Sequence, residues 1–110
     1  MNIWKASSVE QTPSIEIVGW KIFEVSSPHW EGRSRHLSGY NVTEWEGRAS
    51  SHIQGFDKDK MNIRTKSGRV YHLSDEKPRL SMAGDASYVW EFFIKRNDIF
   101  DIEDVTDEYK

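Results

Sequence analysis

Residues 40–73 read YNVTEWEGRASSHIQGFDKDKMNIRTKSGRVYHL, and runs of strand-forming residues alternate there with short polar segments. The polar segments contain the glycine, aspartate and serine residues that are typical of turns between paired strands. Because each connection is short, consecutive strands must run antiparallel, as they do in hairpins. The stretch therefore predicts one antiparallel meander, and we expect the rest of the chain to cover one of its faces or to close its edge.

The connection Lys66–Gly68 gives the most definite register. Glycine at position 68 can adopt the left-handed conformation that a three-residue loop with a following bulge requires. Such a loop places Ile63 opposite Tyr71, so that the apolar residues of both strands share one face. A two-residue loop would instead place Ile63 opposite His72. We therefore predict the three-residue turn.

The segment Glu46–Gly47 is predicted to be a two-residue hairpin loop. Such a loop places Tyr40 opposite Ile53, which again brings apolar residues together on one face. It also leaves Trp45 beside Arg48, where the indole ring and the guanidinium group can stack.

A third loop, at residues 57–59, is predicted to bring Ile53 opposite Ile63. The three loops together divide the meander into two faces, as expected for an antiparallel sheet with one wet side. The apolar face, which must be buried, contains Tyr40, Val42, Ile53, Met61, Ile63, Tyr71 and Leu73. The opposite face is polar and forms the candidate binding face, with Asn41, His52, Gln54, Asn62, Arg64 and His72.

The flanking segments supply a strand before the meander and a helix after it. Residues 15–25 are strand formers whose apolar alternation changes phase, which predicts a bulge near Val18–Gly19. Residues 85–96 form the predicted helix, with Asp85 as its N-cap and a wide apolar sector. Apolar and acidic residues alternate imperfectly along residues 99–105. This segment is predicted to add an edge strand whose acidic side chains prevent pairing with another chain.

The predicted fold class is thus α+β. It is a bent antiparallel sheet of five or six strands, either an open meander or a partly closed barrel, packed on one C-terminal helix at about residues 85–96. Phe92 is expected to lie in the core between helix and sheet. Residues 1–14 are predicted to be a loose N-terminal segment, residues 15–106 a single domain, and residues 107–110 a frayed tail.

Composition and charge exclude several kinds of site and indicate where the protein is found. The chain has 110 residues, no cysteine and a formal net charge of −3 at pH 7. The absence of cysteine excludes disulfides, thiolate zinc sites and cysteine nucleophiles, and it leads us to expect a cytoplasmic protein. Residues 1–10 contain no apolar stretch long enough for a signal peptide, and no apolar run is long enough to span a membrane. The net charge argues against nucleic-acid binding through bulk electrostatics, although a local basic patch is compatible with it.

No catalytic or metal-binding motif is found in the sequence, and no cofactor is expected. The four histidines, His29, His36, His52 and His72, lack the i, i+4 spacing of a helical metal site. Ser51 directly precedes His52, and neighbours on a strand point to opposite faces, so this pair does not make a nucleophile and its base. An enzyme is therefore disfavoured.

Several short motifs between residues 37 and 93 carry a resemblance to known proteins. These motifs are Gly39–Thr43, Glu46–Arg48, Ser50–Ser51, Thr65, Ser67–Arg69, Tyr71, Leu73, Asp85 and Tyr88–Trp90. With them the chain resembles a group of short uncharacterised bacterial proteins. The resemblance implies a bacterial or phage-related source and carries over no activity and no site residue.

Three functional hypotheses follow. The first is a non-catalytic module that binds another protein. It would use the candidate binding face, the loop tryptophans Trp30 and Trp45, or the acidic edge strand at residues 99–105. The second is a nucleic-acid-binding module that uses the basic residues of the meander, including Arg64 and Lys66. The third is a phage-related inhibitor that presents carboxylates to a host protein. A solvated sheet face that binds nothing is the simpler alternative. The candidate stacking and basic residues are Trp30, Trp45, Arg48 and Arg69.

Overall fold

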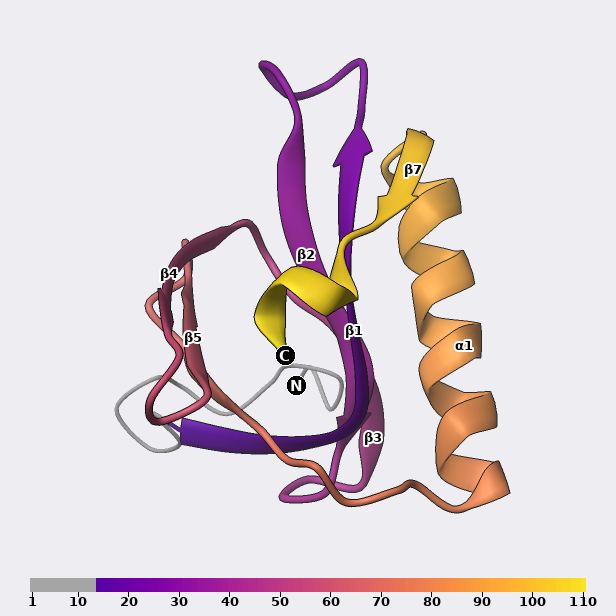
Figure 1. Cartoon of the computed structure of the whole chain (residues 1–110). Coiled ribbons are helices and arrows are strands. Elements are labelled where there is room, and N and C mark those ends of the chain that lie inside the picture. The colour runs from indigo at the N-terminus through magenta and orange to yellow at the C-terminus, as the bar shows by residue number, and fades with distance from the viewer. Residues whose placement is uncertain (1–13) are drawn as a thin grey trace, which may run out of the picture.

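A computed structural model describes residues 14–110 of the chain, and its elements follow one another as six strands, one long helix, a seventh strand and a short C-terminal turn of helix (Figure 1). The elements are β1 (Ser14–Ser26), β2 (Ser34–Asn41), β3 (Glu46–Ala49), β4 (Ile53–Asp57), β5 (Asn62–Thr65), β6 (Val70–Leu73), α1 (Leu80–Arg96), β7 (Phe100–Asp104) and the 3-10 helix η1 (Thr106–Tyr109). The predicted α+β class, with a sheet packed on one helix, is confirmed.

The first strand, β1, organises the sheet. The strand order is β3-β2-β1-β6-β5-β4, and β7 also pairs with β1. β1 is 13 residues long, and its side chains of Ile15, Ile17 and Ile22 are fully buried. A long strand with several fully buried side chains is best stabilised where both of its edges are paired. β1 therefore lies between the two parts of the meander.

The sheet is mixed and open, whereas we expected it to be wholly antiparallel. β1 runs parallel to β6, with Ile15 opposite Tyr71 and Ile17 opposite Leu73. All other strand pairs are antiparallel. The parallel pair is possible because the whole segment from β2 to β5 serves as the crossover between β1 and β6.

The predicted bulge in the first strand is confirmed. The pairing of β1 with β2 shifts register between Val18 and Lys21. Gly19 lies in this shift with φ of 59°, a left-handed conformation that glycine adopts without steric cost. The bulge bends β1, so that its N-terminal half pairs with β6 and its C-terminal half pairs with β7 (Figure 1).

The turn at Lys66–Gly68 is also confirmed. Gly68 has φ of 87°, and the amide of Thr65 donates to the carbonyl of Arg69 across the turn at 3.0 Å. Ile63 consequently lies opposite Tyr71. Both residues are buried in the main core, as the register predicted.

The other two predicted registers are wrong. Tyr40 lies opposite Gly47 rather than Ile53, because β3 folds back on β2 and makes no pairing with β4. Ile63 lies opposite Phe56 rather than Ile53, because Asp57 pairs with Asn62 and the turn is therefore residues 58–61 rather than 57–59. Local loop length could not reveal the first change, because it depends on which strands become neighbours, whereas the second is a difference in the length of the β4–β5 turn itself.

The β2–β3 turn is built from residues 42–45 and not from Glu46–Gly47. The buried side chain of Asn41 accepts hydrogen bonds from the amides of Thr43 (2.9 Å) and Glu44 (3.0 Å), so it closes the turn as a backbone group would. Trp45 takes the left-handed position at the end of the turn, with φ of 58°. Asn41, which we predicted to lie on the candidate binding face, is therefore part of the scaffold.

The helix begins earlier than predicted and presents a different face. α1 starts at Leu80 after Arg79, so Asp85 lies inside the helix and does not cap it. Ala86 and Trp90 are the buried residues of α1, and the ring of Trp90 stacks on Phe23 of β1 at 4.7 Å between centroids. Phe92, which we expected in the core, is 57% exposed.

The C-terminal residues, which we expected to fray, fold against the sheet. The amide of Ile22 in β1 donates to Oγ1 of Thr106 at 3.0 Å. Tyr109 is buried and its ring lies 4.7 Å from that of Phe56. The edge strand predicted at residues 99–105 is present as β7.

Candidate functional site

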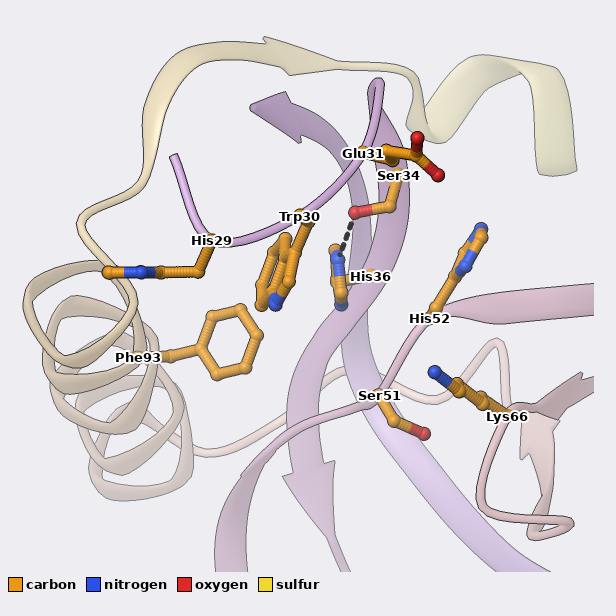
Figure 2. A pocket seen from close by; sticks show the side chains of 9 residues that line it. All are labelled: His29, Trp30, Glu31, Ser34, His36, Ser51, His52, Lys66 and Phe93. Atoms are coloured by element: carbon orange, nitrogen blue, oxygen red, sulfur yellow. Dashed lines mark hydrogen bonds between the residues drawn. The ribbon is translucent and has the colours of Figure 1, made fainter. Parts of the chain in front are cut away.

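A pocket of about 530 Å³ opens where the β1–β2 connection, β2, the segment before β4, the β5–β6 turn and α1 meet (Figure 2). These segments are far apart in the sequence, so only the tertiary fold creates the pocket. Its lining residues are His29, Trp30, Glu31, Ser34, His36, Ser51, His52, Lys66 and Phe93.

His36 is the most enclosed polar group of the pocket, with 2% of its surface exposed. Its Nδ1 lies 2.9 Å from the carbonyl oxygen of Ser50, and its Nε2 lies 2.7 Å from Oγ of Ser34. A carbonyl oxygen can only accept, so Nδ1 carries the proton of this hydrogen bond. In the neutral ring Nε2 is then the acceptor, and the hydroxyl of Ser34 donates to it.

The neutral form of His36 is the favoured one. Burial lowers the pKa of His36 below its usual range, and positive charge on His52 lowers the pKa further, against the opposing effect of the hydrogen bond to Ser50. His52 lies close, with 6.2 Å between the two ring centroids. The imidazole of His36 is therefore uncharged at neutral pH and keeps Nε2 free to accept a proton.

Two aromatic rings hold the imidazole of His36 in place (Figure 2). The ring of Trp30 stacks on it with 5.0 Å between centroids and 26° between planes. The ring of Phe93, from α1, lies 5.2 Å away at a tilt of 53°. Trp30 also contacts Phe93, with 6.1 Å between ring centroids. These contacts form an apolar wall beside the polar Ser34–His36 pair.

Side-chain contacts join the β1–β2 connection to the C-terminal end of α1, and they hold Trp30 beside the pocket. Oγ of Ser27 donates to the carbonyl of Asn97 at 2.6 Å and accepts from the amide of His29 at 3.1 Å. The ring of His29 then pairs with the carboxylate of Asp98 at 2.7 Å. Two consecutive contacts therefore join the loop to the helix.

The opposite wall is tied to β2 and to the β5–β6 turn by backbone contacts. The amide of Leu37 donates to Oγ of Ser50 at 2.8 Å, and the amide of Ser50 donates back to the carbonyl of Leu37 at 2.9 Å. The amide of Lys66 donates to the carbonyl of His52 at 2.7 Å. This arrangement explains how Lys66, from a distant turn, comes to line the pocket with His52.

The structure distributes the residues of the candidate binding face over several places. Asn41 and Arg64 do not lie side by side as a continuous meander would require, because β1 and β6 separate β2 from β5. Asn62 and His72 are neighbours, with Oδ1 to Nδ1 at 3.0 Å. Gln54 is exposed on β4 and Arg64 is exposed on β5. The side chain of Arg64 lies over Gly55.

The candidate stacking and basic residues are also divided. Trp30 lines the pocket, together with His52 of the candidate binding face. Trp45 is 68% exposed at the β2–β3 turn. Arg48 is largely enclosed and pairs with two glutamates at 3.2 Å each, and Arg69 is buried. The predicted stacking of Trp45 on Arg48 is not among the ring contacts of residues 14–110.

Sequence reasoning missed Ser34 and the role of His36. The two residues are two positions apart on β2, so their side chains lie on the same face. That spacing was a usable signal for a serine–histidine contact. It was overlooked because a polar pair on a strand normally indicates a solvated face, and its burial depends on Trp30 and Phe93 from other segments.

Other kinds of site are absent from the described part of the chain. Within residues 14–110, no group of three or more histidine, cysteine or acidic side chains is placed to hold a metal ion. No helix in the same range is long and apolar enough to cross a membrane. No family model, curated protein or solved structure matches this chain. Functional inference therefore rests on the geometry of the pocket.

Proposed function

We propose that the protein is a small protein-binding module whose pocket receives a short segment of its partner. The observation that carries this proposal is the combination, in one pocket, of an apolar wall from Trp30 and Phe93 with the cationic or donor groups of His52 and Lys66. Recognition pockets of this type bind an apolar side chain and orient it through a few polar contacts. The absence of cysteine supports a reducing compartment such as the cytoplasm.

The charges of the pocket favour a partner segment that carries a carboxylate. Among residues 14–110, Lys66 makes no ion pair, although its backbone is held by His52. Glu31 is the one acidic residue of the lining. A lysine that lines a pocket with an apolar wall, and that has no ion-pair partner among the described residues, is suited to a charge-assisted hydrogen bond with an acidic side chain or a chain terminus.

Nucleic-acid binding is the weaker alternative. Of the basic residues proposed for it, Arg48 is paired with glutamates and Arg69 is buried, which leaves Arg64 and Lys66 facing outward. Two separated cations make a small electrostatic footprint for a phosphate backbone. The acidic-surface hypothesis is weakened in a similar way, because Arg33 lies 3.5 Å from Asp101 and reduces the exposed negative charge on β7.

Replacing Lys66 by alanine is expected to lower the affinity for the partner about 10–100-fold. This is the usual effect of losing a charge-assisted hydrogen bond. The partner would first be recovered by affinity capture, and its binding to purified variants would then be measured by calorimetry. Arg64→Ala serves as the matched control, because Arg64 is an exposed cation on the adjacent strand that lies outside the pocket. It should leave the affinity nearly unchanged.

Two outcomes would contradict the proposal. If Arg64→Ala weakens binding and Lys66→Ala does not, the recognition surface is the part of the candidate binding face that contains Arg64. If both variants lose affinity and wild-type binding to random oligonucleotides falls steeply with salt, the nucleic-acid alternative is favoured.

A further inference from the structure

We propose that Ser34 is a nucleophile activated by His36, and that the pocket carries out acyl transfer on esters with a small apolar acyl group. This inference goes beyond the proposed binding function and uses the floor of the same pocket. It rests on the contacts of Ser34, His36 and Ser50, the enclosure of the imidazole, and the open space that these groups line (Figure 2).

The three groups occupy the relative positions of a nucleophile, its base and the group that orients the base. Oγ of Ser34 lies 2.7 Å from Nε2 of His36, and Nδ1 of the same ring lies 2.9 Å from the Ser50 carbonyl. Nucleophilic serines are activated by a hydrogen bond of this length to a neutral imidazole whose other nitrogen is held by an acceptor. Here a backbone carbonyl takes the place that a carboxylate has in the serine–histidine–aspartate arrangement.

The carbonyl that orients His36 is itself fixed. The Ser50 amide and hydroxyl both contact the backbone of Leu37, which lies next to His36 on β2. Ser34 is held by its own pairing with Val25 of β1. Both residues lie on β2, two positions apart, so their side chains share one face and a single strand sets the relative positions of Oγ and Nε2, as a proton transfer requires.

The pocket supplies the remaining requirements for acyl transfer. Ser34 and His36 both line it, so a carbonyl carbon can approach Oγ from the open side. Trp30 and Phe93 form an apolar surface for the acyl group. His52 and Lys66 are the polar groups of the lining that can stabilise the negative charge of a tetrahedral intermediate.

The proposed reaction balances without an oxidant, a reductant or a cofactor. Oγ of Ser34 forms a bond to the carbonyl carbon as its proton moves to Nε2 of His36. The bond from this carbon to the alcohol oxygen of the ester then breaks, and the leaving alcohol takes the proton from Nε2. Water next gives a proton to Nε2 and attacks the acyl-serine, which releases a carboxylic acid and returns the proton to Ser34.

The test uses a fluorophosphonate reagent, which phosphonylates activated serines with loss of fluoride, followed by peptide mass spectrometry of the whole chain. The wild-type protein should carry the adduct on Ser34, and Ser34→Ala should carry none. His36→Gln should slow labelling at least about 100-fold, which is the lower end of the contribution of a general base. Ser38→Ala is the matched control, since Ser38 is a buried serine of the same strand without an imidazole contact; it should label at the wild-type rate.

The proposal would be overturned by wild-type protein that remains unlabelled while folded, by an adduct on another serine, or by unchanged labelling of Ser34 in His36→Gln. The wild-type result is decisive even if the His36 variant does not fold. As a second readout, wild-type protein treated with a p-nitrophenyl ester should show acylated Ser34 in the intact mass. Failure of this site is separable from failure of the binding function, because labelling does not require the partner protein and partner affinity is tested at Lys66.

Discussion

Ile63→Ala is expected to lower the free energy of unfolding by about 2–5 kcal/mol, the usual range for emptying a buried aliphatic position. Ile63 is 1% exposed on β5 and belongs to the main core cluster together with Tyr71 and Leu73 of β6. The loss combines the transfer of the removed methyl groups with the cavity that the neighbouring strands cannot close. A denaturant titration that follows tryptophan fluorescence gives the value.

The matched control for Ile63 is Phe92→Ala, which removes a larger apolar side chain. Phe92 projects from the outer face of α1 and is 57% exposed. We expect its replacement to change the unfolding free energy by no more than about 0.5 kcal/mol. Equal losses in the two variants would mean that α1 is rotated relative to the sheet.

Gly47→Ala is expected to destabilise the protein by about 1–3 kcal/mol, which is the usual cost of forcing an extra group into a close-packed contact. A Cβ atom at position 47 would lie 2.5 Å from the carbonyl oxygen of Asp85 and 2.9 Å from Cγ2 of Val89. The nearest obstacle is backbone, so α1 would have to move away from β3. Thermal unfolding monitored by circular dichroism would show the lowered midpoint.

Gly55→Ala provides the comparison for Gly47, because it also adds a methyl group to a glycine within a strand. At position 55 the nearest atoms belong to the flexible end of Arg64, at 3.2 Å. We expect a change of no more than about 0.5 kcal/mol. If Gly47→Ala were as well tolerated as Gly55→Ala, the close packing of α1 on β3 would be incorrect.

Local features of the chain were predictable because they depend on neighbouring residues. The turn at Lys66–Gly68 and the bulge at Gly19 each require a glycine with positive φ, and the sequence provides one at both places. The alternation on either side of that turn then identified Ile63 and Tyr71 as facing core residues.

Features that depend on distant segments were not predictable from local patterns. Loop length specifies a register only if consecutive strands pair, and β3 pairs with β2 alone, while β1 occupies the position between β2 and β6. The glycine at position 47 was interpreted as a turn residue, but it serves the close approach of α1. The helix start at Leu80 was missed because a polar residue, Asp85, matched a cap signal that the fold does not use.

The candidate site was predictable only in part. Trp30 and His52 were identified for separate reasons, as a loop aromatic ring and as a member of a polar face, and the fold brings both to the pocket. His36 and Ser34 become functional candidates only because Trp30 and Phe93 enclose them. No local sequence pattern indicates that two other segments, the β1–β2 connection and α1, enclose this pair.

The geometry makes His36 a neutral base in the pocket, with Nδ1 protonated and Nε2 directed at Ser34. A long-range proton–nitrogen NMR correlation of the imidazole at pH 7 distinguishes the possible protonation states, because the two tautomers and the imidazolium give distinct nitrogen shifts. We predict the Nδ1-protonated tautomer for His36, with a sharp change in its nitrogen shifts in Ser34→Ala. An imidazolium, or a ring protonated at Nε2 alone, would show that His36 does not act as the base for Ser34.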